Sequence, residues 1–138
     1  MSIPSGTIVQ HLVDDVFNGR NWDAFDNLHD PDGPIHRGGE VATPAEIKAL
    51  HQARLKAFPD LWWTVERQIE NGDIVVTHAT WRGTHYGTYL GIQATGRVVN
   101  GEVIAIRKIA AGRVVETWAV ADTLRVLEQI SRRGTAVS

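Results

Sequence analysis

Histidines are the side chains of this chain best suited to proton transfer near neutral pH. There are six, and there is no cysteine. His85 stands in the string Gly-Thr-His-Tyr-Gly at residues 83–87, where it either bonds a loop carbonyl or serves as an acid, base or ligand contact in a pocket. The lack of cysteine excludes a thiol nucleophile, a cysteine-ligated metal and disulfide bonds.

The remaining histidines do not predict a metal centre. His11, His29, His51 and His78 are spaced too widely to share one element, and the sequence has no His-x-x-x-His pair with an acidic partner. We therefore expect no metal and no cofactor, so any chemistry must come from the side chains themselves.

Aromatic residues offer a second kind of site. Five of the ten are tryptophan, which indicates either large core packing or an aromatic-lined pocket for a hydrophobic small molecule. The aromatic residues that we expect to contact such a ligand are Phe17, Phe58, Trp63, Trp81, Tyr89 and Trp118.

The first half of the chain predicts three helices and a short strand. Apolar residues recur at helical spacing over residues 8–17, after a possible cap at Thr7 and before Asn18-Gly19. Asn21 can cap a short second helix, and residues 35–37 read as a strand. The string Thr-Pro-Ala-Glu at 43–46 predicts a capping box, with a helix that runs to about Phe58.

The second half predicts strands and a closing helix. Strands are expected over 62–70 and 73–83, joined by the hairpin signal Asn71-Gly72, and over 97–109 and 114–121. Three glycines break residues 84–96 into an irregular connection with at most one short strand. Asp122 can cap the closing helix, and the polar tail from Ser131 is expected to fray.

Helices followed by strands indicate the α+β class. We expect one domain over residues 1–138: a cone-shaped, curved antiparallel sheet with three N-terminal helices on its concave face and a short C-terminal helix. The strand at 97–109 is apolar on both faces, with Val103 and Ile109 on one and Ile104 and Ile106 on the other. The second apolar face predicts a homodimer.

Composition narrows the class of protein. A net charge of −2 on 138 residues argues against nucleic-acid binding. Unbroken apolar runs reach only about four residues, against the roughly 20 that a membrane span needs, and no secretory signal is visible at the N-terminus. We expect a cytoplasmic protein that has no contact with membranes.

Several strings, in this order and spacing, resemble the SnoaL-like polyketide cyclases of the nuclear transport factor 2-like superfamily, over nearly the whole chain. They are residues 17–23 (FNGRNWD), 58–60 (FPD), 83–87 (GTHYG), 90–92 (LGI), 95–97 (TGR), 112–118 (GRVVETW) and 127–130 (LEQI). The resemblance implies a ligand inside the cone. It also implies cofactor-free closure of an aromatic polyketide ring by intramolecular aldol condensation.

The resemblance also implies where the catalytic groups of the family stand. Characterised members use an aspartate on the last strand, with a histidine on the preceding strand nearby. An ungapped alignment puts Ala119 and Ala105 at these places, both facing the cone interior. A shift of three residues brings Asp122 to the aspartate's place instead, so Asp122 is either a helix cap or a base.

Two further polar groups complete the candidate site. His36 lies on the first strand, where the resemblance implies a polar substrate contact. Arg107 shares its strand face with Ala105, so it either neutralises an anionic ligand or faces a subunit partner. Two functions remain open: an enzyme (a cyclase, isomerase or hydrolase) that uses His85, His36 or Asp122, and a binding or accessory protein that keeps the pocket without the cyclase pair.

Overall fold

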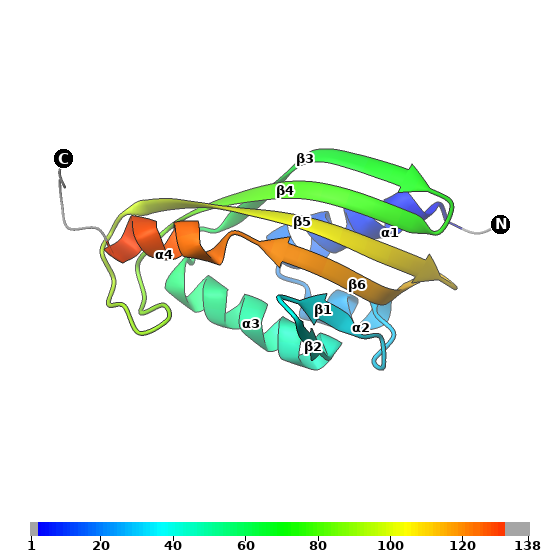
Figure 1. Cartoon of the computed structure of the whole chain (residues 1–138), viewed down its shortest axis with the longest axis horizontal. Coiled ribbons are helices and arrows are strands. Elements are labelled where there is room, and N and C mark those ends of the chain that lie inside the picture. The colour runs from blue at the N-terminus through cyan, green and yellow to red at the C-terminus, as the bar shows by residue number, and fades with distance from the viewer. Residues whose placement is uncertain (1–2, 132–138) are drawn as a thin grey trace.

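Helices come first in the chain and strands dominate its second half (Figure 1). A computed structural model describes residues 3–131. The helical elements are α1 (Ser5–His11), the π-helical η1 (Leu12–Asn18), α2 (Trp22–Leu28), α3 (Pro44–Ala57) and α4 (Thr123–Ser131). The strands are β1 (Ile35–Arg37), β2 (Glu40–Ala42), β3 (Trp62–Asn71), β4 (Ile74–Thr84), β5 (Val98–Ala110) and β6 (Arg113–Ala121).

These strands form one curved, unclosed sheet in the order β2-β1-β6-β5-β4-β3. The expected α+β fold is confirmed, with one correction to the sheet. It is mixed rather than purely antiparallel, because β1 runs parallel to β6. No tight turn joins these two strands, so their relative direction was not constrained by hairpin geometry. The short strand β2, which pairs with β1, was not predicted.

Local sequence signals set most of the element boundaries. The Asn21 side chain accepts a hydrogen bond from the Ala24 N–H, and both bonds of the Thr43–Glu46 capping box are present. The first helix differs from the prediction. It begins at Ser5 without a side-chain cap, since the residue at the cap position is Pro4, whose carbonyl accepts from the Thr7 and Ile8 N–H groups. It widens into the π-helical η1 (Leu12–Asn18).

The connection over residues 85–97 holds an isolated bridge between Tyr89 and Ile92 and no regular strand. Leu90 and Gly91 both have positive φ angles there, of 49° and 81°, which reverse the chain tightly. The expected fraying of the tail concerns residues 132–138, which lie outside the described residues, while Ser131 ends α4.

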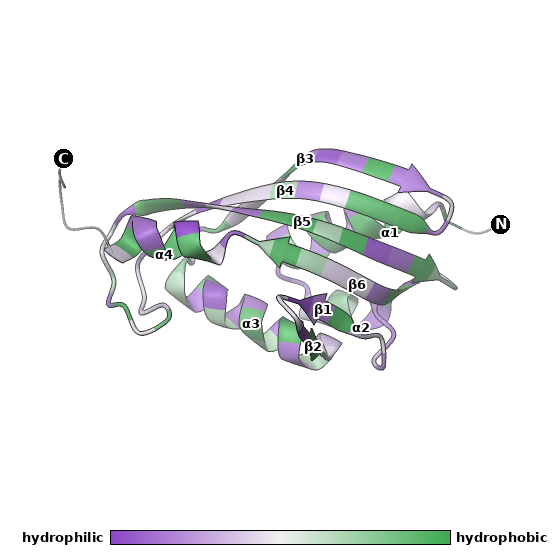
Figure 2. Ribbon diagram, in the orientation of Figure 1, coloured by the Kyte–Doolittle hydropathy of each residue, from purple (hydrophilic) through white to green (hydrophobic). Residues whose placement is uncertain are grey.

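The two faces of the sheet differ. Figure 1 shows α1, α2 and α3 on one side of the sheet, where the hydrophobic core lies. The other side keeps apolar side chains in solvent along β5 and β6, where Figure 2 shows hydrophobic stretches. They are Ile104, Ile106, Trp118 and Val120. Within residues 3–131, no helix has the length and apolar character needed to cross a membrane.

Candidate functional site

A cavity of about 90 Å³ lies between the concave face of the sheet and the helices. Much of its wall is apolar and comes from η1, α2, α3 and the neighbouring strands. The larger apolar side chains of this wall include Val13, Phe17, Phe25, Ile35, Ile47 and Trp63. A wall of this kind suits the flat hydrophobic body of a small molecule.

The sheet contributes the floor of the cavity. Ala105 on β5 pairs directly with Ala119 on β6. Thr77 on β4 pairs with Ala105, and Arg37 on β1 pairs with Ala119. All four side chains line the cavity, so two methyl groups lie between a hydroxyl and a guanidinium along one row of cross-strand neighbours.

A second polar pair lies in the adjacent row of the floor. Arg107 pairs with Thr117 across β5 and β6, and both line the cavity. Burial lowers the pKa of Arg107 from its ordinary value to about 10, because desolvation disfavours the charged form. The guanidinium is still protonated at neutral pH.

Helix α3 places His51 and Arg54 over the cavity, one turn apart. The His51 ring stacks on Phe17 at 4.5 Å between centroids. Burial, with a smaller contribution from Arg54 and Arg107, holds the pKa of His51 well below 6.5. His51 is therefore a neutral imidazole at pH 7, with a lone pair that can accept a proton.

His29, which follows α2, is a second neutral imidazole in the wall. Burial lowers its pKa from 6.5 to about 4, although the hydrogen bond to the Phe25 carbonyl partly opposes this. The Nδ1–H donates to that carbonyl oxygen at 2.8 Å, and the ring stacks on Phe25 at 4.1 Å.

His85 lies outside this cavity. It is fully buried between the loop and Phe58, with ring centroids 5.4 Å apart. The Thr95 backbone N–H donates to the Nδ1 atom of His85 at 3.2 Å, and the Thr95 hydroxyl lies 3.0 Å from the same atom. These contacts join the two ends of the 85–97 connection.

His36 and Trp118 lie on the opposite face of the sheet. They are partners in the parallel register of β1 and β6 and stack at 5.4 Å. His36 Nε2 also lies 2.8 Å from Glu116 Oε2. Since successive residues of a strand face opposite sides, Arg37 and Ala119 enter the cavity while His36 and Trp118 do not.

Asp122 and three of the predicted aromatic residues lie beyond one end of the cavity. The Asp122 Oδ1 atom accepts the Arg125 N–H at 3.2 Å at the start of α4. Phe58 packs against Trp81 and Tyr89, at 5.0 and 5.2 Å between centroids. Asp122, Trp81 and Tyr89 surround a separate small space of about 10 Å³.

The SnoaL-like polyketide cyclase family model matches residues 7–130. This chain belongs to that family. Its fold is shared with AclR from Streptomyces galilaeus, a candidate hydroxylase, at 27% identity and a TM-score of 0.82, covering 90% of this chain and 92% of AclR. IdmH from Streptomyces antibioticus, a candidate polyketide cyclase, is 26% identical with a TM-score of 0.82, covering 91% of this chain and 96% of IdmH.

A candidate SnoaL-like polyketide cyclase from Jannaschia sp. CCS1 has the same fold, with a TM-score of 0.84 at 24% identity over 94% of this chain and 92% of that one. The comparison with curated proteins gave no match.

In this SnoaL-like chain, the sequence-predicted residues separate into two groups. The cavity brings together Phe17, Trp63, Ala105, Arg107 and Ala119. The residues outside it are His36, Phe58, Trp81, His85, Tyr89, Trp118 and Asp122. No group of three or more His, Asp or Glu side chains within residues 3–131 is placed to hold a metal ion.

Sequence reasoning identified Arg107 but missed other polar residues that line the cavity. His51 and Arg54 follow Ile47 at positions i+4 and i+7, which puts them on the apolar face of α3. Thr77 alternates with Val75 and Ala79 on the buried face of β4. The helical spacing of His51 and Arg54 and the strand alternation of Thr77 can both be read from the sequence. They are easily overlooked because polar residues are usually assigned to the solvent side of an element.

Proposed function

We propose that this SnoaL-like protein binds a flat, hydrophobic small molecule inside the cone without a cofactor, and that aldol ring closure is not an efficient activity of it. The observation that carries the proposal is the direct pairing of Ala105 and Ala119 on the floor of a largely apolar cavity. In the ungapped alignment, the family resemblance puts the acid–base pair at these two places. Two methyl groups bind an apolar surface but transfer no proton.

One of the relatives, the candidate polyketide cyclase IdmH, supports a ligand of the polyketide kind. AclR and IdmH match this chain over more than nine-tenths of their own lengths, so the fold is common to all three. Positioned acid–base groups typically contribute about 10²–10⁴-fold to a rate. Loss of the pair at Ala105 and Ala119 therefore predicts a comparable loss of cyclase rate.

The test compares the natural chain with the variant Ala105→His/Ala119→Asp on an aromatic polyketide ester. Binding is expected in both, and faster ring closure in the double variant. Ala105→His/Ala121→Asp is the matched control, because Ala121 lines the same cavity two residues further along β6. Robust turnover by the natural chain would refute the proposal.

His51 supports a second candidate function, cofactor-free proton abstraction. It faces the cavity as a neutral base, and Arg107 is close enough to lower its pKa. A neutral imidazole can remove an acidic proton from carbon between two carbonyl groups, and a nearby guanidinium stabilises the enolate that forms. An isomerase or a related enolising enzyme would use this arrangement.

Proton exchange in D₂O tests that candidate, with a flat aromatic 1,3-diketone as the probe and NMR as the readout. The natural chain should accelerate loss of the signal from the proton between the carbonyls. His51→Gln should abolish the acceleration. His36→Gln, on the outer face, should leave it unchanged. Equal exchange by both variants would eliminate His51 as the base.

The outer face of the sheet carries the homodimer proposal. Ile104 pairs with Val120 and Ile106 with Trp118, so four apolar side chains form one contiguous patch. Val120 is 74% exposed and Ile104 is 50% exposed. We propose that a second copy covers this patch. Sedimentation should give a dimer that Val120→Glu dissociates, and a natural chain that sediments as a monomer at micromolar concentration would refute it.

A further inference from the structure

The cavity is strongly cationic and has no counter-charge of its own. Arg37 enters it from β1, Arg54 from α3 and Arg107 from β5, and none of the residues that line it is Asp or Glu. None of the ion pairs found within residues 3–131 includes any of these three arginines. Burial partly desolvates the charge of Arg107, and a desolvated cation is costly unless an anion pairs with it.

The same cavity holds buried hydrogen-bonding groups without partners. The Thr77 and Thr117 hydroxyls make no hydrogen bond and are 2% and 4% exposed as residues. The Nε atom of Arg54 is also buried without a partner. Because buried polar groups in native proteins are nearly always bonded, three such groups around one cavity offer a bound ligand hydrogen-bonding partners that no other protein group uses.

The sheet register gathers these groups around the two alanines. Arg37 and Thr77 flank the Ala105–Ala119 pair within one row of the floor. Arg107 and Thr117 form the next row, and cross-strand neighbours of this kind have Cβ atoms about 5 Å apart. A small anionic group above the alanine methyls therefore has guanidinium and hydroxyl donors on two sides.

Arg54 lines the cavity from α3, and its side chain packs against two aromatic rings. Its guanidinium lies 6.0 Å from the Trp63 ring centre and 5.8 Å from that of Trp81. Cation–π contact of this kind fixes the side chain while leaving its charge without an acidic partner. The apolar wall beyond Arg54 is suited to the uncharged body of the same ligand.

We propose that the ligand of this cavity is a hydrophobic organic acid whose carboxylate lies over Ala105 and Ala119, bound by Arg107 with Thr77 and Thr117 as additional donors. The inference rests on the proposed function and narrows its ligand class from hydrophobic molecules to acids. A planar carboxylate matches the paired N–H groups of a guanidinium. The protonation of Arg107 at neutral pH supplies the charge that a carboxylate requires.

Isothermal titration calorimetry tests the inference with two probes of one shape: 2-naphthoate, which carries a carboxylate, and 2-naphthamide, which is neutral. For the natural chain we expect the acid to bind at least about 10-fold more tightly than the amide, as a charge-assisted bond implies. Inorganic phosphate should bind weakly, because it lacks an apolar body.

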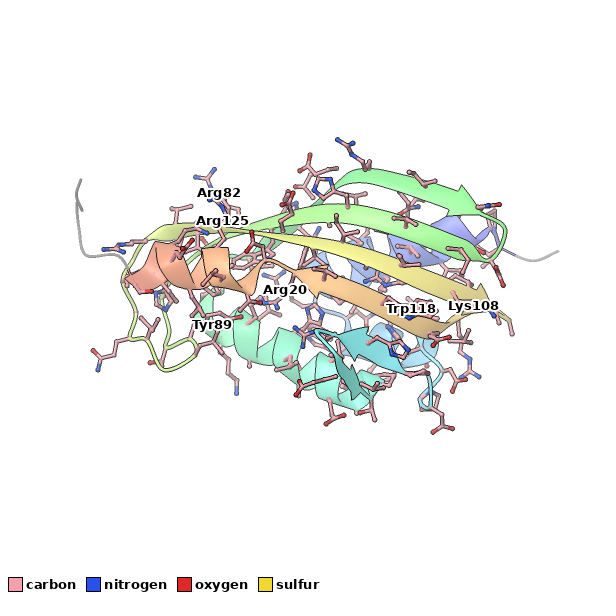
Figure 3. All side chains as sticks on the ribbon, viewed as in Figure 1. Arg20, Arg82, Tyr89, Lys108, Trp118 and Arg125 are labelled. Carbon is pink, nitrogen blue, oxygen red and sulfur yellow. The ribbon has the colours of Figure 1, made fainter. Side chains whose placement is uncertain are left out.

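Substitution of Arg107 then locates the anion. Arg107→Met should reduce the preference for the acid to near unity and leave amide binding intact, whereas Arg107→Lys should keep most of the preference. Arg82→Met is the matched control, since Arg82 is exposed on β4 and Figure 3 shows it projecting away from the sheet. That variant should bind both probes as the natural chain does.

Each other outcome has a definite meaning. Equal binding of acid and amide by the natural chain overturns the inference while the proposed function stands, and this comparison needs no variant to fold. Binding of neither probe overturns both. Phosphate binding as tight as that of naphthoate also overturns the inference, because the site would then recognise an inorganic anion. An acid preference that persists in Arg107→Met refutes the assignment to Arg107.

Discussion

The free energy of unfolding should begin to fall with pH well above the pH at which the carboxylates of this protein protonate. His29 should account for a measurable part of this fall. His29 is 4% exposed and its Nδ1–H donates to the Phe25 carbonyl. Burial lowers its pKa from 6.5 to about 4. Between these two values the unfolded chain binds a proton on this ring that the native state does not bind, so stability falls as the pH falls.

The size of the effect follows from the two pKa values. With 6.5 in the unfolded chain and about 4 in the native protein, lowering the pH from about 7.5 to about 5 costs roughly 2 kcal/mol through His29. The loss is nearly absent above about pH 7 and levels off below about pH 4. His51, with its lowered pKa, adds to the total in the same direction.

Urea unfolding at several pH values between about 7.5 and 5 measures this linkage. The variant His29→Gln isolates the contribution, because glutamine can keep a donor near the Phe25 carbonyl and does not titrate. The natural chain should lose roughly 2 kcal/mol more over this range than the variant does. Identical pH slopes for the two proteins would refute the assignment of a neutral, buried His29.

Three further substitutions test packing and capping, each by chemical denaturation. Asp122→Ala should cost about 0.5–2 kcal/mol because the bond to the Arg125 N–H at the start of α4 is lost; unchanged stability with loss of an activity would favour a catalytic Asp122 instead. Asn18→Ala should cost about 1–3 kcal/mol, since the Asn18 side-chain amide bonds both the N–H and the carbonyl of Trp63, at 2.7 and 2.9 Å. Gly101→Ala should cost about 1–3 kcal/mol and alter the near-ultraviolet circular dichroism, because the new Cβ would clash with the indole ring of Trp81. Unchanged stability of Asn18→Ala or of Gly101→Ala would contradict the packing described.

Local signals in the sequence determined where most elements begin and end. The Asn21 cap, the Thr43–Glu46 capping box and the Asn71-Gly72 hairpin depend on residues that are near neighbours in the chain. The hydrogen bonds and backbone preferences that form these features therefore involve only a few consecutive residues. The ordered strings of the family resemblance likewise indicated the cone and its family before any contact between distant residues was known.

Other parts of the fold could not be predicted from local sequence signals. The parallel pairing of β1 with β6 joins residues about eighty positions apart, and the π-helical turn of η1 carries no residue signature. A strand of three residues such as β1 has too few alternations to reveal which face is buried. Only the pairing shows that Arg37 faces the cavity while His36 faces outward.

The sequence by itself therefore determined the fold class, most of the helix caps and the hairpin. Tertiary structure decided which titratable groups share a cavity. The sequence left both a structural and a functional role open for His85, and packing against Phe58 buries it outside the cavity. His51 has no chemical partner near it in the sequence, yet α3 places it in the same cavity as Arg107. The physical reason is that a side chain's chemistry depends on its desolvation and its charged neighbours, and both are supplied by residues distant in the chain.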